Sequence, residues 1–140
     1  MKTHRAMAAV FAGLALTLAA CSTTASPPAS GTTITGTLTE YKIALSAATA
    51  PAGEITFNVT NAGTMIHEFV ILKTDTLAAD LPLVSDKVTE ADYTAPGEVA
   101  ETDPTKSGTV TLTLAAGHYA IICNIAGHVR QGMVIDFTVS

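Results

Sequence analysis

Apolar and polar residues alternate along most of the chain after residue 33. An alternation of period two places successive side chains on opposite faces of a strand and therefore predicts β-structure. Turn sequences such as Pro51-Ala52-Gly53 and Ala115-Ala116-Gly117 separate the alternating segments. The pattern predicts about seven to eight short strands in an all-β, antiparallel sandwich or barrel. The alternating segments are residues 34–38, 41–45, 55–59, 67–72, 110–114, 119–123 and 133–139.

The segment from Thr74 to Lys106 breaks this regularity. It contains eight of the twelve acidic residues of the chain, all within residues 75–103, together with Pro82, Pro96 and Pro104. Proline and dense charge favour a long surface excursion that can include one short helical turn, and loops of this length are commonly functional or mobile. We therefore expect a mobile acidic segment outside the sandwich.

The first twenty residues have the layout of a secretory signal peptide. Lys2 and Arg5 precede an apolar run, residues 6–18, that is too short to span a bilayer. The sequence Leu18-Ala19-Ala20-Cys21 resembles the bacterial lipobox, and this resemblance implies that Cys21 is lipidated and begins the mature chain. The alternative is an ordinary signal peptide that leaves Cys21 unmodified.

The domain organisation follows from this interpretation. Residues 1–20 are the signal peptide, residues 21–33 are the lipidated cysteine with a flexible tether, and residues 34–140 are one folded domain. We expect the protein in the bacterial cell envelope, lipid-anchored to a membrane on its extracytoplasmic side.

The net charge argues against two kinds of partner. The formal charge is −5, and removal of Lys2 and Arg5 with the signal peptide makes the mature chain more acidic still. Nucleic-acid binding needs a basic surface, and so does adsorption to anionic lipid. We expect neither nucleic acid nor an anionic bilayer surface as a partner.

The candidate chemistry lies around the last two predicted strands. Cys123, His128 and Met133 fall within eleven residues, and His67 opens an earlier strand. Cys123, His67 and Met133 each share the inward phase of their strands, so their donor atoms point into the interior at strand ends. If Cys21 is lipidated, Cys123 is left as an unpaired thiol, which is unusual in an exported protein. Two His, one Cys and a weak axial Met form the ligand set of a blue copper site.

Each of these residues also has a purely structural explanation. A buried cysteine behaves as a small hydrophobe, a single methionine commonly fills a core, and the histidines fit a satisfied core position and an exposed loop. All four donors in compact spacing nevertheless favour a metal site. Met65 shares the phase of His67 and is an alternative axial donor, whereas His118 has the opposite phase to Cys123 and is expected to be exposed and not a ligand.

Two stretches, residues 61–70 and 117–133, resemble those of a cupredoxin. The spacing Cys-x4-His-x4-Met is like that of auracyanins and close to that of azurins. The resemblance covers about residues 34–140 and implies a Greek-key sandwich with one copper ion. The ligands that it implies are His67, Cys123, His128 and Met133.

Two positions depart from the pattern of that family. Ala126 stands where many relatives carry proline, and Glu68 stands where many carry an asparagine that ties the ligand strands together. An ionised Glu68 near copper favours Cu(II) and lowers the reduction potential. The resemblance also implies an apolar rim around the loop histidine where electrons enter and leave. The rim residues expected here are Met65, Ile66, Ile125, Ala126 and Val129.

These features predict a one-electron carrier, which binds no substrate and is not an enzyme. The expected partners are redox proteins, such as a basic cytochrome or a cuproenzyme, which the acidic segment is available to steer, and we expect a monomer. An alternative with the same ligands is copper storage or delivery to an envelope cuproenzyme. A hydrolase built on Cys123 and His128 is a weaker alternative, because an inward cysteine beside Met133 is poorly placed to meet a substrate.

Overall fold

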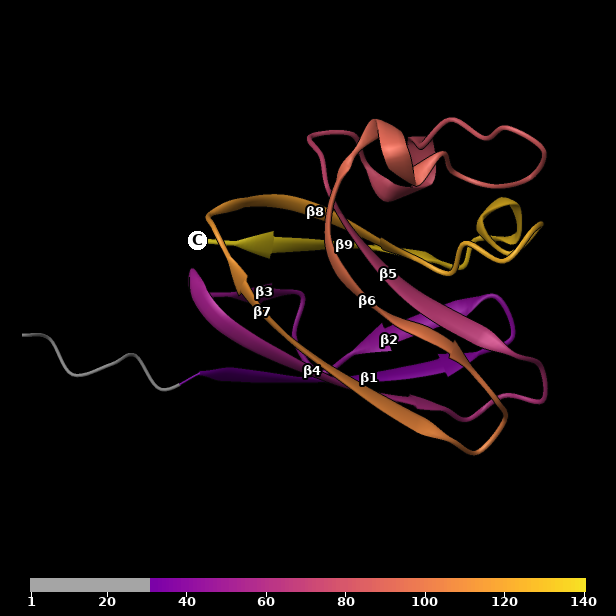
Figure 1. The fold of residues 1–140 in the computed structure, drawn as a ribbon, viewed down its shortest axis with the longest axis horizontal. Helices are drawn as coiled ribbons and strands as arrows, with labels where there is room; N and C mark the ends of the chain where they lie inside the picture. Colours follow the sequence, from indigo (N-terminus) through magenta and orange to yellow (C-terminus); the bar gives the residue numbers. More distant parts are fainter. Residues whose placement is uncertain (1–30) are drawn as a thin grey trace, which may run out of the picture.

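The computed structural model describes residues 31–140, which form two β-sheets packed face to face (Figure 1). The predicted signal peptide, the lipid-attachment candidate Cys21 and the tether up to residue 30 lie outside the described residues. Within residues 31–140, no helix combines the length and the apolar character needed to cross a bilayer. The all-β class that the alternation predicts is confirmed.

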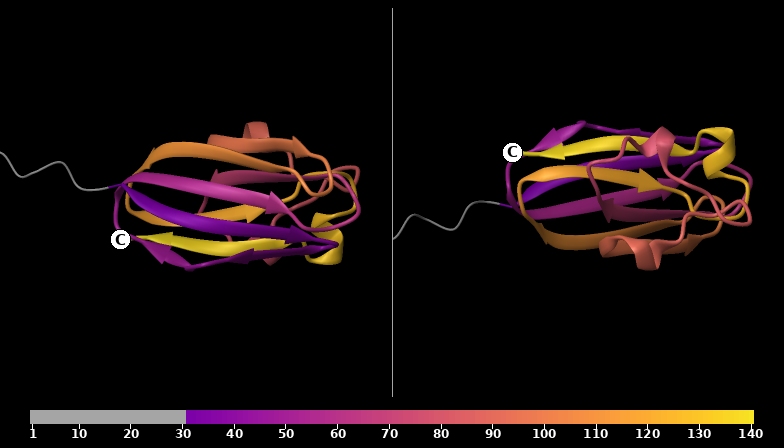
Figure 2. Two further views of the ribbon diagram at one scale, coloured as in Figure 1. Left: turned by 90° about the horizontal axis from the view of Figure 1, so that it is seen from below. Right: turned by 90° about the horizontal axis from the view of Figure 1, so that it is seen from above.

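Most neighbouring strands are antiparallel, but β1 lies parallel to β4 and β3 lies parallel to β9, so both sheets are mixed. Figure 2 shows the two layers from the side. The first sheet has the spatial order β2 (Lys42–Leu45), β1 (Thr32–Thr39), β4 (Gly53–Asn61), β7 (Ser107–Leu114). The second has the order β3 (Thr49–Ala50), β9 (Val134–Val139), β8 (Gly117–Ile122), β5 (His67–Lys73), β6 (Thr94–Thr102).

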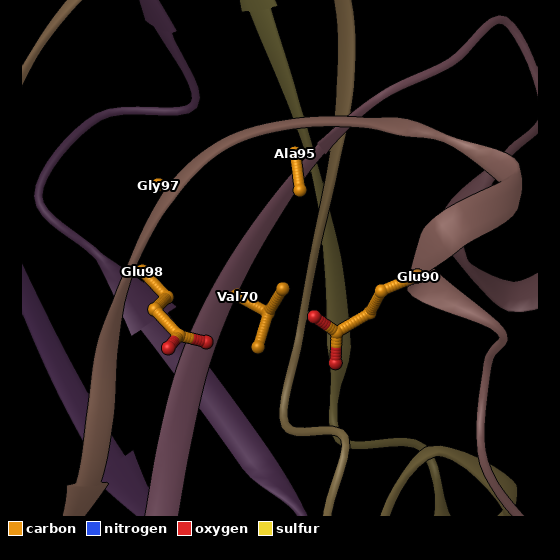
Figure 3. Close-up of a pocket in the computed structure, with 5 residues that line it drawn as sticks. All are labelled: Val70, Glu90, Ala95, Gly97 and Glu98. Carbon is orange, nitrogen blue, oxygen red and sulfur yellow. The ribbon is translucent and has the colours of Figure 1, made fainter.

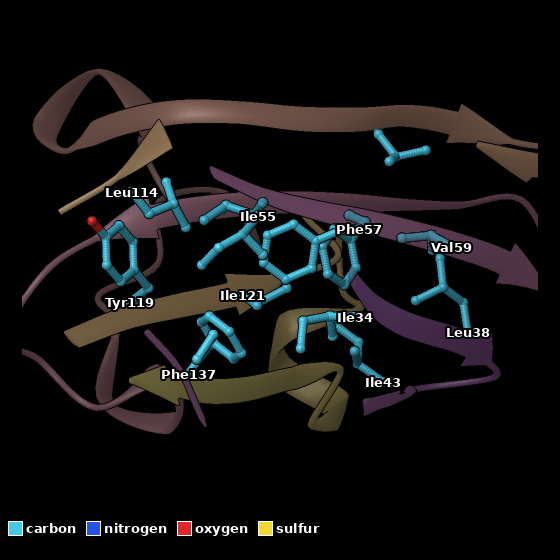
Figure 4. Packing of buried hydrophobic residues seen from close by; sticks show 14 of the residues in the cluster. Ile34, Leu38, Ile43, Ile55, Phe57, Val59, Leu114, Tyr119, Ile121 and Phe137 are labelled. Atoms are coloured by element: carbon cyan, nitrogen blue, oxygen red, sulfur yellow. The ribbon is translucent and has the colours of Figure 1, made fainter. Parts of the chain in front are cut away.

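The main core fills the space between the sheets. Alternate residues of each strand point into it, because a period of two places them on one face. Phe57 of β4 is fully buried, and its ring centroid lies 5.6 Å from that of Phe69 and 5.5 Å from that of Phe137. Figure 4 shows Phe57 and Phe137 reaching toward each other from opposite sheets. Cys123 belongs to the same buried cluster, so the inward phase predicted for it is confirmed.

The prediction that residues 74–106 form a mobile segment outside the sandwich is wrong for the second half of that segment. Residues 94–102 form β6, a nine-residue strand that pairs with β5 at the edge of the second sheet. Val99 is the one residue of β6 that is buried, so this strand lacks the apolar alternation that identifies the others. An edge strand that carries Pro96 and exposed charges gives no periodic signal in the sequence.

The first part of the same stretch, residues 74–93, covers the outer face of the second sheet, and we call it the cover segment. It contains two single 3-10 turns, η1 (Ala78–Asp80) and η2 (Glu90–Asp92). Its buried side chains form a second apolar cluster with the outward-facing residues of β5 and β8. The cover segment is therefore a packed layer, and β5 and β8 are buried on both faces.

The two ends of the sandwich differ in what they carry. β1 has eight residues and spans about 26 Å, so it runs along most of the molecule. Thr32, its first residue, lies at the end that also holds the C-terminus (Figure 1). The connections before β5 and after β8, where the candidate metal ligands lie, are at the opposite end.

Phe57→Ala should lower the free energy of unfolding by about 3–5 kcal/mol, because it leaves a cavity between Phe69 and Phe137. Urea unfolding followed by circular dichroism measures the change. Glu54→Ala on the exposed face of the same strand is the control and should shift stability by less than about 0.5 kcal/mol. Equal losses in the two variants would contradict a core centred on Phe57.

Candidate metal centre

Three side chains with metal-binding chemistry meet at one end of the sandwich. One ring nitrogen of His67, Sγ of Cys123 and one ring nitrogen of His128 all lie within 4.8 Å of one another. All three side chains are buried. They are close enough to share one ion.

The pairing of β5 with β8 brings the first two of these residues together. Val70 pairs with Ile122 in the antiparallel ladder, so the start of β5 lies beside the end of β8. His67 is the first residue of β5, and Cys123 directly follows the last residue of β8. The backbone N–H of Glu68 donates to Sγ of Cys123 at 3.4 Å and closes the gap between the two strands.

A tight loop returns the chain from Cys123 to Met133 and contains the 3-10 turn η3 (Val129–Gln131). Gly132 ends this turn in the left-handed conformation, with φ of 95°, which favours glycine. The N–H of Cys123 donates to the carbonyl of Met133 at 3.1 Å, and the N–H of Met133 donates to the carbonyl of His128 at 3.0 Å. The backbone itself therefore holds three of the four predicted ligands together.

Both imidazoles present Nδ1 to the thiol of Cys123. The distances from Sγ are 3.9 Å to Nδ1 of His67 and 3.2 Å to Nδ1 of His128. Burial lowers the pKa of both histidines, and the proximity of His128 lowers the pKa of His67 further. Both rings are therefore neutral near neutral pH, which is the form in which imidazole binds a metal.

The thiol of Cys123 is held in its protonated form when no cation is beside it. Burial raises its pKa, and the backbone amides of Glu68 and Ile125 act in the opposite direction. A metal cation replaces the thiol proton and removes the cost of burying a bare thiolate. The two backbone amides are then in place to stabilise the charge on sulfur.

The two candidate axial methionines differ in burial. Met133 is 0% exposed and belongs to the main core cluster, whereas Met65 is 39% exposed. Sδ of Met65 lies 4.0 Å from the hydroxyl of Tyr41. Of the two thioethers, that of Met133 is the one placed inside the protein with Cys123.

A buried asparagine orders the connection that leads into β5. Asn61 is fully buried, and its Oδ1 accepts a hydrogen bond of 2.9 Å from the N–H of Gly63. Its Nδ2 donates to the carbonyls of Met65 and Thr102, each at 2.8 Å. These bonds fix the turn from which His67 emerges. Sequence reasoning missed this role, because Asn61 stands in a run that looks like an ordinary turn.

Glu40 is a second residue that the sequence does not reveal. Its carboxylate accepts hydrogen bonds from the backbone N–H and the hydroxyl of Thr64, and these bonds, the backbone one foremost, hold its pKa at about 2. Its charge acts on His67 and opposes the fall in the pKa of that ring. A Cβ at Gly63 would lie 2.8 Å from Oε1 of Glu40 and 3.1 Å from Nε2 of His67, so a side chain at this position would displace the Glu40 carboxylate.

The chemistry of these donors fits copper. A thiolate and a thioether are soft ligands, and imidazole suits copper as well as zinc. Nε2 of His67 is buried without a hydrogen-bond partner among the described residues, while Nδ1 of the same ring faces the thiol. A neutral imidazole that carries its proton on Nε2 leaves Nδ1 free to bind an ion beside Sγ.

His118 differs from the sequence-based expectation, because it is half-buried rather than exposed. Its Nδ1 lies 2.6 Å from the carbonyl of Thr74, and its Nε2 lies 2.9 Å from the carboxylate of Asp136. It stands near the start of β8, away from Cys123 at the other end of that strand. Nδ1 therefore ties the cover segment to β8, and Nε2 ties β8 to β9.

The expected apolar rim is also only partly present. Val129 is 8% exposed and packs in the second apolar cluster beneath the cover segment, so its assignment to the rim is wrong. Ile125 is half-buried against the main core. Met65, Ile66 and Ala126 are exposed, as expected.

Carboxylates gather on the second sheet beside the site. Burial raises the pKa of Glu68, and Lys87 opposes this shift while Glu90, Glu98 and Glu101 add to it. Glu90 and Glu98 line a cavity of about 250 Å³, and Figure 3 shows their carboxylates on either side of β5. The face next to the Cys123 strand is therefore negatively charged.

Comparison with protein families gives a match over most of the chain. The family model for the sulfocyanin (SoxE) domain matches residues 13–140. Comparison with curated proteins gives no match.

Solved structures with a similar fold include two auracyanins and a rusticyanin. Reduced auracyanin from Roseiflexus castenholzii is 22% identical with a TM-score of 0.61, over 78% of this chain and 97% of that one. Auracyanin A, described as a blue copper protein of Chloroflexus aurantiacus, is 19% identical with a TM-score of 0.57, over 79% and 100%. Rusticyanin from Thiobacillus ferrooxidans is 18% identical with a TM-score of 0.59, over 82% and 79%. These likenesses establish the fold.

Proposed function

This chain belongs to the sulfocyanin (SoxE) domain family, and on that premise we propose that it is a one-electron carrier. It is a cupredoxin-type blue copper protein with one copper ion. Bound copper supplies the couple between Cu(I) and Cu(II). The ligands that we propose are His67, Cys123, His128 and Met133.

The observation that carries this proposal is the buried meeting of one thiol with two imidazoles. Sγ of Cys123 lies within 3.9 Å of Nδ1 of both His67 and His128. The burial that raises the pKa of the thiol also excludes water from it. A catalytic cysteine needs access to a substrate, whereas a cysteine that binds a metal does not.

A carrier must keep its ligands in one geometry while its charge changes. The β5–β8 ladder fixes His67 against Cys123, and backbone hydrogen bonds tie Cys123 and His128 to Met133. These supports come from rigid strands and a glycine-terminated turn. Little reorganisation is then needed in either oxidation state.

Electron exchange is proposed to pass through the edge of His128. This ring is 4% exposed and lies edge-on against the ring of Tyr41, with 5.4 Å between the centroids. The exposed side chains of Met65 and Ile66 stand at the same end of the sandwich, just before His67. This apolar surface and the nearby carboxylates of β6 fit a redox partner with a basic docking face.

Copper storage or delivery with the same ligands is the alternative function. It requires the metal to leave readily, and the full burial of Cys123 and Met133 opposes such release. The rate of copper loss therefore separates the two functions.

We also propose a lipid-anchored location in the bacterial cell envelope. The support is the Leu18-Ala19-Ala20-Cys21 sequence that follows an apolar run. The described domain begins at the end of the sandwich opposite to the metal ligands (Figure 1). An anchor joined there leaves the site facing away from the membrane, where a partner can reach it.

The first prediction tests the ligand set. The mature protein with one equivalent of Cu(II) should develop an intense blue or green colour, because a thiolate bound to copper gives a strong charge-transfer band. Cys123→Ser should abolish that band. A band that survives in Cys123→Ser, or a colourless wild-type complex, would refute the proposed site.

The reduction potential of the copper-loaded protein, measured by redox titration, distinguishes the two methionines. Met133→Leu should keep copper bound and raise the reduction potential, since the axial ligand tunes the potential. Met65→Leu is the matched control and should leave the potential unchanged. The reverse result would assign the axial position to Met65.

The second prediction tests electron transfer. Ile66→Lys places a positive charge on the exposed apolar surface, where it repels a basic partner, and should slow electron exchange with basic redox proteins roughly tenfold while leaving the visible spectrum intact. The wild-type rate should fall as salt rises, because charges are screened over about 10 Å at 0.1 M. Stopped-flow kinetics at several ionic strengths measure both effects.

Leu77→Lys is the control for this experiment, since Leu77 is 54% exposed but lies on the cover segment beside η1. Equal slowing in both variants would place the docking surface elsewhere. Sluggish exchange with every partner, together with rapid copper loss to a Cu(I) chelator, would favour the delivery function.

The third prediction concerns the anchor. The wild-type precursor expressed in a bacterium should carry lipid on Cys21 and sediment with membranes, whereas Cys21→Ser should appear in the soluble envelope fraction. Mass spectrometry and fractionation measure these outcomes. A membrane-bound Cys21→Ser chain of normal size would exclude lipid anchoring at this residue.

A further inference from the structure

The cover segment, residues 74–93, reaches beyond the sheet to the loop that carries His128. Its tip is a two-residue turn in which Val84 and Lys87 exchange backbone hydrogen bonds. Ser85 and Asp86 within it have φ of 51° and 64°, the positive values that define a type I′ turn. The carbonyl of Asp86 accepts a hydrogen bond of 3.0 Å from the N–H of Gly127 in the ligand loop.

Asn124, the residue after Cys123, makes the buried link between the two segments. Its side chain is buried, and Oδ1 accepts a hydrogen bond of 2.8 Å from the N–H of Val88. Nδ2 donates to the carbonyl of Val88 at 2.9 Å and to Oε1 of Glu90 at 2.7 Å. One carboxamide therefore bonds both backbone groups of Val88, as a neighbouring strand does, and uses both of its N–H groups.

Two further contacts attach the same loop to the cover segment. Val129 and Val88 belong to the same apolar cluster. Arg130 forms an ion pair with Asp86. The loop is thus attached on both sides of His128.

From these contacts we propose that Asn124 is a positioning residue that, through the cover segment, fixes Cys123 and His128 relative to each other. The effect that this assignment predicts on the spectrum and potential rests on the proposed copper site. The contacts themselves involve only residues of this chain.

The position of Asn124 in the chain explains how it acts. It stands between Cys123 and Ile125, and the amide of Ile125 is one of the two that act on the thiol. Without the carboxamide, the N–H and the carbonyl of Val88 lose their partners in a buried place, and such groups must find water or move. The loop then keeps the Gly127–Asp86 hydrogen bond, the Arg130–Asp86 ion pair and the apolar cluster of Val88 and Val129, but it loses its buried polar link, so the cover segment holds it less tightly.

The cover segment has a second polar attachment that offers a matched control. Oδ1 of Asp136 on β9 accepts hydrogen bonds from the N–H of Ala78 at 2.8 Å and from His118. This attachment holds η1, away from the ligand loop. Asp136→Ala should therefore loosen the same segment without acting on His128.

The experiment compares Asn124→Ala with Asp136→Ala. Both variants should melt at a lower temperature than the wild type. Only Asn124→Ala should speed hydrogen exchange at the Gly127 amide in the metal-free protein. With copper bound, only this variant should shift the charge-transfer band and the potential, and it should lose Cu(I) to a chelator roughly tenfold faster.

The assignment would be overturned if Asn124→Ala folds and keeps the wild-type exchange rate at Gly127, the wild-type charge-transfer band and the wild-type potential. It would also be overturned if Asp136→Ala shifted these three quantities as much as Asn124→Ala does. Should Asn124→Ala not fold, Glu90→Ala and Glu90→Gln replace it, because both remove the charge but only Gln keeps an oxygen acceptor for Asn124. Hydrogen exchange at the Gly127 amide should be faster than in the wild type in Glu90→Ala but not in Glu90→Gln. Equal exchange rates in these two variants would overturn the assignment. Failure of the wild type to bind copper refutes the proposed function but leaves the exchange measurement valid.

Discussion

The register between β5 and β8 is the constraint on which the metal centre depends. Because side chains alternate with a period of two, a slip of one residue in this ladder would turn Cys123 away from the core and away from His67. The register is fixed by burial on both faces of the two strands. Phe69 and Ile121 pack inward between the sheets, and Val70 and Ile122 pack outward beneath the cover segment. Either face alone specifies the register, and both agree.

Two buried asparagines complete what the strands cannot supply. Strand pairing places His67 and Cys123, but the connections before β5 and after β8 have no ladder to hold them. Asn61 bonds Gly63 and Met65 in the first connection and Thr102 at the end of β6, and Asn124 bonds the cover segment beside the second connection. A buried carboxamide is costly unless all its bonds are made, so each of these side chains tolerates one arrangement of its surroundings. This is a physical reason for the two flexible-looking loops to have one conformation.

The sequence was sufficient to predict the inward strands and the donors at their ends, because alternation reports directly on the face that a side chain occupies. It failed where burial comes from a partner distant in the chain. Val99 is the single buried residue of β6, and Val129 is buried by a segment about forty residues earlier. Position 68 holds Glu where many relatives carry asparagine, and the cross-link that the structure shows runs from Asn124 to a different segment. No local sequence pattern predicts the burial or the hydrogen bonds of a side chain whose partners are distant in the chain.

The cover segment has two roles, packing against the sheet and contacting the ligand loop, whereas the sequence showed only that it is acidic. Its buried residues hold the outer face of the second sheet, and its turn at Ser85 and Asp86 meets the ligand loop. Its half-buried Glu90 contributes to the negative charge near Glu68. Screening by salt acts on exposed charge and leaves buried hydrogen bonds intact. Ionic strength can therefore change the rate at which a partner arrives without changing the geometry of the site, which is the behaviour that an electron carrier with a steering surface requires.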